Sequence, residues 1–150
     1  MKKILILLAV LTIASCTTKK IPVTAEEATM KDVLTMNTPF IKKKSKLFTG
    51  DFHLRNLSAK NSMIIFLHDI TCNWGDQVGV VRNDRPFNIG EKTINIPIGS
   101  VKTVKLRCDV SNTGSGEMSF TIKRIFDNAN HDGQTAGSIL GENLTWKYKE

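Results

Sequence analysis

Alternation of apolar and polar residues is the feature that most constrains this chain. Over residues 47–150, apolar residues recur with a period of two, and turn-forming residues recur roughly every ten positions. Around Leu106, for example, the neighbours Lys105 and Arg107 are charged. This period places successive side chains on opposite faces of a strand, one face buried and the other exposed to solvent. The sequence therefore predicts an all-β domain over residues 47–150, an antiparallel β-sandwich of about seven strands.

The same alternation predicts individual strands and their buried faces. Residues 63–70 begin with a run that is apolar on both faces, which is typical of a central strand. If Ile64, Phe66, His68 and Ile70 point inward, Cys72 continues their face. Pro97 cannot donate to a ladder, so the strand at 93–98 belongs at an edge. Further strands are expected around residues 52–55, 78–81, 87–89, 101–110, 118–122 and 144–148.

The first residues have the order of an export signal. Lys2 and Lys3 precede an apolar run at residues 4–13, and the small residues Ala14 and Ser15 lead into Cys16. The run is too short to span a bilayer as a helix, which takes about 20 apolar residues. A secretory signal at residues 1–15 is therefore expected.

The residues Ile13, Ala14, Ser15 and Cys16 resemble the lipobox of the bacterial lipoprotein precursor family. The resemblance implies cleavage before Cys16, a covalent lipid on its sulfur and often on its new amino group, and anchoring in the cell envelope. Several acyl chains on one residue give stable attachment. In that family an aspartate after the cysteine favours the inner membrane, so Thr17 points to the outer membrane. The alternative is an ordinary secretory signal in which Cys16 is incidental.

Residues 16–46 are interpreted as the lipidated cysteine and a tether. The segment holds Pro22 and Pro39 and has little sustained periodicity. Thr24 and Glu27 have capping-box spacing, and Met30, Val33 and Leu34 share one helical face, which predicts a short helix over about residues 25–36. The tether ends in a cluster of lysines, namely Lys42, Lys43, Lys44 and Lys46. This cluster either contacts anionic head groups near the anchor or is a solvated linker.

Two cysteines remain after Cys16 is assigned to lipid. Cys72 and Cys108 are an even pair in a chain bound for an oxidising compartment, and both have inward phase on their predicted strands. They are expected to form a disulfide, provided that their Cα atoms lie within about 7 Å. The alternative is two unpaired buried thiols.

The charge of the mature chain favours anionic partners. Loss of Lys2 and Lys3 with the signal leaves 19 basic and 14 acidic residues, a formal charge of +5. Such a surplus suits lipid head groups, lipopolysaccharide or acidic glycans, and nucleic acid is a poorer partner for an exported protein. Lys105 and Arg107 on one predicted strand and Lys123 on the next could form a basic stripe across a sheet. The alternative is charge that only keeps the face soluble.

No constellation for catalysis or metal binding stands out in the sequence. There is no nucleophile elbow, zinc-binding helix or phosphate loop. His53, His68 and His131 are far apart, and His68 and Asp69 on one strand would point to opposite faces. Residues 128–133 resemble a calcium loop only in part, since Asn128 replaces an aspartate and Ile139 stands where a glutamate is needed. We expect no enzyme activity, no metal and no cofactor besides the lipid on Cys16.

The predicted architecture resembles the immunoglobulin-like sandwiches of small bacterial envelope lipoproteins. It departs from immunoglobulin domains proper because Trp74 follows Cys72 by only two positions. Our leading hypothesis is a lipid-anchored, non-catalytic binding or assembly-support module with an unidentified protein or envelope glycan partner. The alternatives are an accessory outer-membrane lipoprotein of a secretion system, similar to that of type VI, and a periplasmic inhibitor or immunity protein.

Overall fold

The computed structural model describes residues 18–23, 27–83, 92–128 and 136–149, and these form an antiparallel β structure. Within these ranges the only helical element is the 3-10 turn η1 (Leu67–Asp69). The strands, in chain order, are β1 (Lys19–Pro22), β2 (Ala28–Met30), β3 (Leu34–Asn37), β4 (Phe40–Lys44), β5 (Leu47–Asn56), β6 (Met63–Phe66), β7 (Ile70–Trp74), β8 (Gln77–Asn83), β9 (Thr93–Ile96), β10 (Val101–Val110), β11 (Glu117–Asn128) and β12 (Ala136–Lys149). The predicted all-β sandwich is confirmed.

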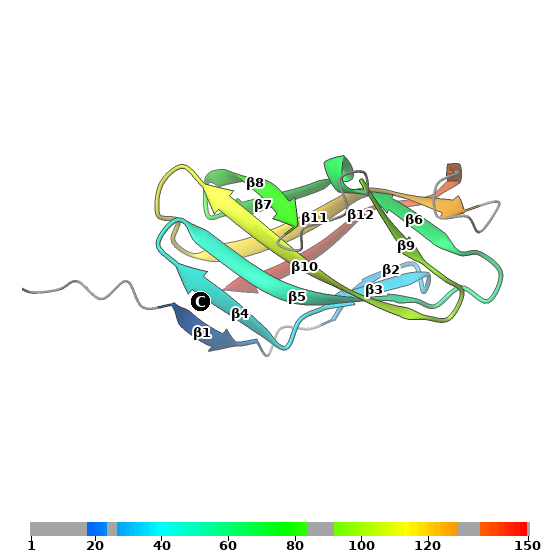
Figure 1. Ribbon diagram of the computed structural model, residues 1–150, viewed down its shortest axis with the longest axis horizontal. Helices are drawn as coiled ribbons and strands as arrows, with labels where there is room; N and C mark the ends of the chain where they lie inside the picture. The colour runs from blue at the N-terminus through cyan, green and yellow to red at the C-terminus, as the bar shows by residue number, and fades with distance from the viewer. Residues whose placement is uncertain (1–17, 24–26, 84–91, 129–135, 150) are drawn as a thin grey trace, which may run out of the picture.

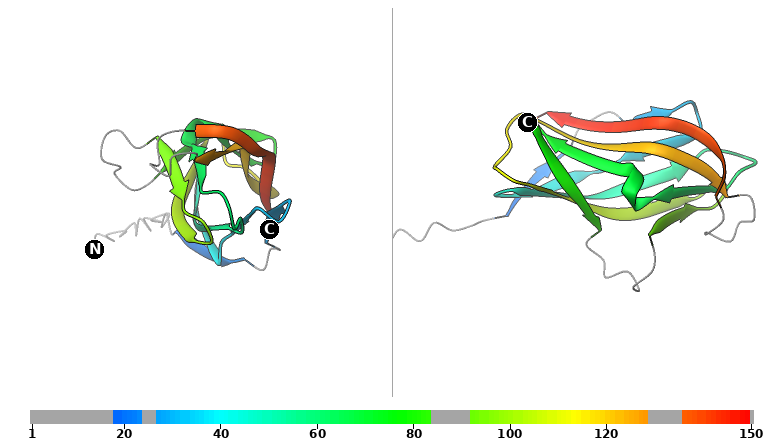
Figure 2. Two further views of the ribbon diagram at one scale, coloured as in Figure 1. Left: turned by 90° about the vertical axis from the view of Figure 1, so that its right-hand side faces the viewer. Right: turned by 90° about the horizontal axis from the view of Figure 1, so that it is seen from above.

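Two long strands, β5 and β11, organise the two layers of the sandwich (Figure 1). On one edge β5 pairs with β4 and then β3, and on the other edge it pairs with β10. On one edge β11 pairs with β12, and on the other with β7 and then β6. Strand β8 pairs with both β10 and β7 and so joins the layers, which curve around a shared core in the end-on view of Figure 2.

A ladder of aromatic side chains fills the core between the layers. Phe48 and Phe52 of β5 both meet Phe120 of β11 edge to face, with ring centroids 5.1 and 5.0 Å apart. Phe48 also meets Trp74 of β7, and Phe52 meets Trp146 of β12, at 5.9 and 5.0 Å. All five rings are buried. Such T-shaped pairs are favourable beyond their area burial, because ring edges and faces carry opposite partial charge.

Most strands predicted in the second half of the chain occur with the expected phase. On β10, Val104, Leu106 and Cys108 are buried while Lys105 and Arg107 face out. Strand β9 pairs only with β6 among the described residues, so the edge position inferred from Pro97 is confirmed. The single strand predicted at residues 63–70 is wrong, because η1 divides it into β6 and β7. His68 is consequently exposed, whereas Cys72 is buried on β7 as expected.

The predicted tether and its helix are wrong for the described residues 19–23 and 27–44, which contain β1 to β4 of the sandwich. Met30, Leu34 and Met36 are buried, and β3 and β4 supply the edge that β5 would otherwise leave open. Lys31 and Asp32 have positive φ and close a tight hairpin in place of a helical turn. The spacing of Met30 and Leu34 fits a helix, but it also fits two residues paired across this hairpin. These strands, with the division of 63–70, raise the count from about seven to twelve.

Within the described residues, no helix is long and apolar enough to cross a membrane.

The aromatic ladder predicts a large effect for Phe120→Ala. Phe120 contacts both β5 rings, so its loss should lower the free energy of unfolding by about 3–5 kcal/mol, the usual cost of truncating a buried phenylalanine. Chemical denaturation measures this cost. Phe40→Ala, at a half-buried ring outside the ladder, serves as the control and should cost about 1 kcal/mol or less. Equal losses in the two variants would contradict the assignment of the ladder as the main contact between layers.

Candidate functional site

The outer face of the layer built on β5 carries a row of basic residues. Strand registers place Lys20 opposite Lys42, Lys42 opposite Thr49, Thr49 opposite Arg107, and Arg107 opposite Arg82. These five positions cross β1, β4, β5, β10 and β8 in one line. Neighbouring strands lie about 4.8 Å apart, so the row brings cations distant in sequence onto one surface. We call Lys20, Lys42, Lys44, Arg82, Lys105 and Arg107 the basic face.

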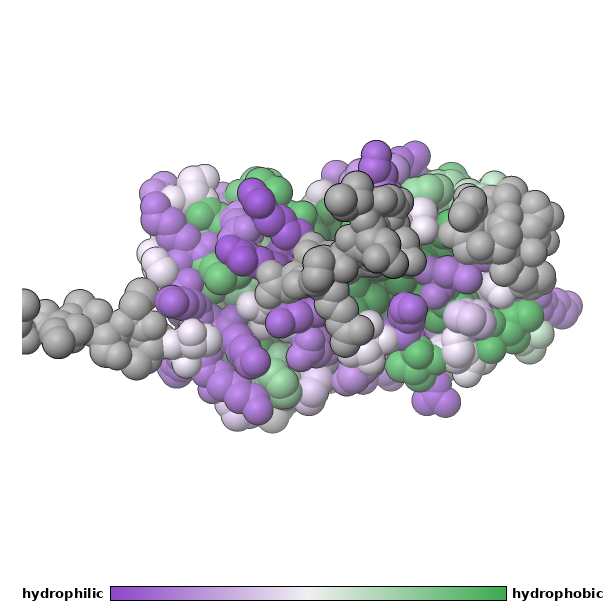
Figure 3. Space-filling model, in the orientation of Figure 1, coloured by the Kyte–Doolittle hydropathy of each residue, from purple (hydrophilic) through white to green (hydrophobic). Residues whose placement is uncertain are grey.

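At the end of the basic face formed by β1 and β4, two lysines lie over an aromatic ring. The Nζ atoms of Lys20 and Lys42 lie 3.9 and 5.9 Å from the centroid of the half-buried Phe40. Cations over a ring face are attracted by its negative quadrupole, which helps to hold two like charges near one another. Hydrophilic residues gather over β1 and β4 in Figure 3. Within the described part of the chain, Lys20, Lys42 and Lys44 form no ion pair with a carboxylate.

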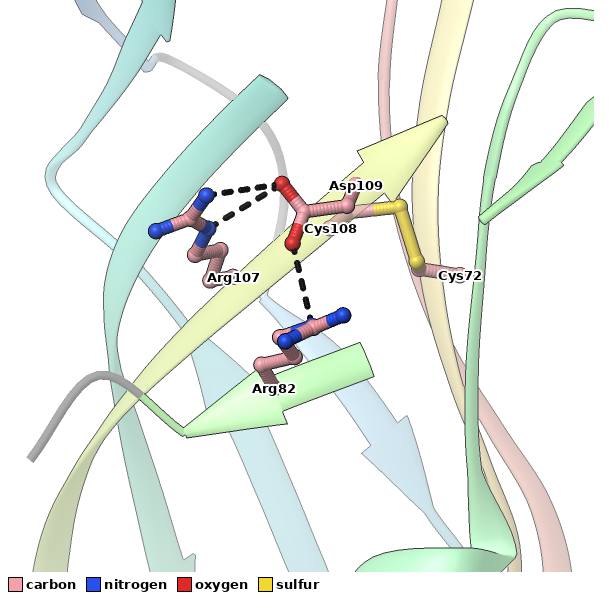
Figure 4. The surroundings of a disulfide bond; sticks show 5 residues. All are labelled: Cys72, Arg82, Arg107, Cys108 and Asp109. Atoms are coloured by element: carbon pink, nitrogen blue, oxygen red, sulfur yellow. Dashed lines mark hydrogen bonds and ion pairs between the residues drawn. A yellow bond between two sulfur atoms is a disulfide. The ribbon is translucent and has the colours of Figure 1, made fainter. Parts of the chain in front are cut away.

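The other end of the basic face is partly neutralised by Asp109. Its Oδ1 accepts hydrogen bonds from Nε and Nη2 of Arg107 at 3.1 and 3.0 Å, and its Oδ2 lies 3.3 Å from Nε of Arg82 (Figure 4). These groups are partly exposed, so each ion pair contributes little stability. Their effect is to fix two guanidinium groups around one carboxylate, which leaves the unneutralised cations at the β1 and β4 end.

The predicted disulfide is present directly beneath this charged cluster. It joins Cys72 of β7 to Cys108 of β10, with Cα atoms 6.0 Å apart. Cys108 and Asp109 are adjacent on one strand, so the bridge points into the core while the carboxylate faces out (Figure 4). The bridge passes under β8, where a Cβ atom on Gly79 would overlap both sulfur atoms. Gly79 is therefore required by the crossing, a role that its sequence context does not reveal.

Sequence reasoning found part of the basic face. Lys42 and Lys44 from the predicted tether cluster and Lys105 and Arg107 from the predicted stripe lie on it, although the sequence did not place the two groups together. Lys43 has the opposite phase, and its Nζ lies 4.7 Å from the ring centroid of Trp74.

Other predicted basic residues lie elsewhere, and some members were missed. Lys46 lies in the turn before β5. Lys123 is on β11 in the other layer, and β10 does not pair with β11, so the predicted stripe through Lys123 is wrong. Lys20 and Arg82 were missed because their strands are adjacent to β4 and β10 only through long-range pairing.

The two described histidines, His53 and His68, have different partners. His53 Nδ1 lies 3.0 Å from Thr103 Oγ1, its partner across β5 and β10. His68 and Asp69 do not point to opposite faces, since η1 brings His68 Nε2 to 3.8 Å from Asp69 Oδ2. The buried Asp69 instead accepts two hydrogen bonds at Oδ1 from Arg124, at 2.9 and 2.7 Å. This pair fastens η1 to β11.

Several predicted positions lie outside the described residues. They include Cys16, residues 87–89, His131 and most of the partial calcium loop at 128–133. The first residue of that loop, Asn128, ends β11 as a buried side chain whose Nδ2 donates to Asn95 Oδ1 at 3.1 Å. Among the described residues, no group of three His, Cys, Asp or Glu side chains is arranged to hold a metal ion.

Comparison with known proteins shows the fold. No protein-family model and no curated protein matches the sequence. A crystal structure from Bacillus subtilis subsp. subtilis str. 168, described as a "putative lipoprotein (ycdA)", matches with a TM-score of 0.54 and 11% identity. The match covers 83% of this chain but only 39% of that one, so this chain spans well under half of its length. The two proteins share an all-β sandwich.

The crossing at Gly79 predicts that Gly79→Ala is incompatible with the native bridge. The added methyl group would displace the sulfur atoms, so the variant should lose about 2–5 kcal/mol, as when a native disulfide is lost, or expose reactive thiols. Thiol titration and chemical denaturation measure both effects. Val80→Ala on the outer face of the same strand is the matched control and should leave the bridge intact. An intact bridge at unchanged stability in Gly79→Ala would contradict this geometry.

Proposed function

We propose that the mature chain is a lipid-anchored protein of the bacterial envelope, held in the outer membrane through Cys16, and that its sandwich is a non-catalytic binding or assembly-support module. The observation that carries this proposal is the lipobox at Ile13, Ala14, Ser15 and Cys16, which stands directly before the sandwich. The fold shared with the Bacillus subtilis chain and a disulfide suited to an oxidising compartment support it.

The chemistry of the outer surfaces supports binding over catalysis. The His53 and Thr103 pair is exposed on a sheet face, where a hydrogen bond between cross-strand partners is ordinary. Arg82 and Arg107 lie beside Asp109, and Lys20 lies over the ring of Phe40, and these contacts hold the cations of the basic face in fixed positions. Catalysis would need a nucleophile or acid beside a base in a water-excluding site.

A second surface feature supports binding to another macromolecule. Val78 and Val80 on β8 are 75% and 60% exposed, and they lie two positions apart on the outer face of the strand. Asp109 on β10 is the register partner of Val80 on β8, so a charged residue borders the apolar pair. Apolar residues with a polar rim are typical of protein interaction sites. We propose that β8 contributes to the contact with a protein partner.

Replacement of Cys16 tests the anchor. Cys16→Ser removes the only sulfur that the lipobox presents, so palmitate labelling should disappear and the protein should leave the membrane fraction or accumulate unprocessed. The matched control is Cys72→Ala with Cys108→Ala, which removes the other two cysteines and should keep full labelling. Continued labelling and membrane retention of the Cys16→Ser protein would overturn the assignment.

Photocrosslinking from β8 tests the binding surface. A photoreactive residue at position 78 should give a discrete adduct in the native envelope, because Val78 is exposed beside a second apolar residue. The same residue at position 123, exposed on the other layer, is the control and should give none. Adducts with membrane proteins would favour assembly support, and one soluble enzyme would favour an inhibitor. The absence of any adduct specific to position 78 would count against β8 as the interface.

A further inference from the structure

The cations at the β1 and β4 end of the basic face form a compact group, Lys20, Lys42 and Lys44, which we call the lysine patch. Lys20 and Lys42 are register partners, and Lys44 lies two residues further along the same face of β4. Strand spacing and rise place these positions roughly 5–7 Å apart. All three are exposed, and they have no carboxylate partner within the described residues. The nearest outward acid on β5, Asp51, stands opposite Lys105 on β10 instead.

The distance from the lipid attachment to this patch is limited by the chain itself. Strand β1 begins at Lys19, so only Thr17 and Thr18 separate it from Cys16. The four residue steps from Cys16 to Lys20 span at most about 14 Å when extended. This span is less than two Debye lengths, each about 8 Å at physiological ionic strength. An anchored Cys16 therefore holds the patch where it experiences the surface potential of the bilayer.

Phe40 gives the patch an apolar centre. The ammonium groups of Lys20 and Lys42 both lie near its half-buried ring, and Pro22 is its register partner on β1. A ring with lysine stems around it presents apolar surface while the charged heads reach toward phosphate. The apolar ring suits the acyl boundary of a bilayer, and the charged lysine heads suit its phosphate groups.

We infer that the lysine patch docks onto anionic phospholipid head groups of the leaflet that holds the Cys16 lipid, and so fixes the orientation of the sandwich on the membrane. This inference rests on the proposed anchor for its geometry. The charge of the patch suits phosphate oxygens, and each lysine near an anionic surface contributes up to about fivefold in affinity. Replacing all three should therefore weaken membrane binding by about a hundredfold at low salt.

The test uses unlipidated mature protein carrying Cys16→Ser, so that its outcome is independent of acylation. Sedimentation with phosphatidylcholine vesicles, with and without phosphatidylglycerol, should show binding only to the anionic vesicles. The binding should weaken as salt is raised, and it should persist when inorganic phosphate replaces part of the salt at constant ionic strength. The variant Lys20→Gln, Lys42→Gln, Lys44→Gln should lose it, while retaining the disulfide and a native circular dichroism spectrum.

The matched control is Lys123→Gln, Lys147→Gln, Lys149→Gln, which removes the same charge from the outer face of β11 and β12. It should bind nearly as the parent does. Equal loss in both triple variants would show attraction by net charge alone and would overturn the inference. Binding to neutral vesicles as strong as to anionic ones, or displacement by free phosphate, would also overturn it. Each of these failures leaves the palmitate test of Cys16 unaffected.

Discussion

The contact of Phe48 and Phe52 with the opposite layer is the interaction on which the rest of the structure depends. Gly50 lies between them on the same face of β5, and its missing side chain leaves the space that the Phe52 ring occupies. Together with Trp74, Phe120 and Trp146, the two rings join four strands into one core. Once β5 is fixed in this way, its two edges determine where β3, β4 and β10 pair, and with them where the outer basic side chains lie.

Neighbouring residues on one strand link the core to the outer surface, because they point to opposite faces of the sheet. On β10 the inward Cys108 is bridged to β7 while the neighbouring Asp109 holds Arg107 and Arg82 outside. A slip of β10 by one residue would expose the sulfur and bury the carboxylate, at a large desolvation cost. The disulfide therefore fixes the register that aligns the basic face. This relation gives the exposed side chains of the basic face a defined arrangement.

The sequence predicted those features that local alternation determines. The phase of Leu106, Cys108 and Phe120 follows from period two, and with it the sandwich class and the cysteine pair. Features set by long-range pairing were missed. Strand β1 has four residues, two of them lysine and one proline, and only its pairing with β4 makes it a strand. The same pairing brings Lys20 to Lys42, so the lysine patch could not be assembled from the linear sequence.

The presence of β1 directly after the proposed anchor at Cys16 reduces the affinity that the lysine patch would need. A long flexible tether would let the domain sample many orientations, and the patch would then have to bind strongly to select one. With two residues between Cys16 and Lys19, the effective concentration of the patch at the lipid surface is in the millimolar range or above. In the proposed arrangement, a moderate affinity from three lysines and one half-buried ring would be enough to hold one orientation. In the proposed arrangement the lipid supplies the residence time and the patch supplies the orientation, so mutation should separate the two functions although they act within a few residues of each other.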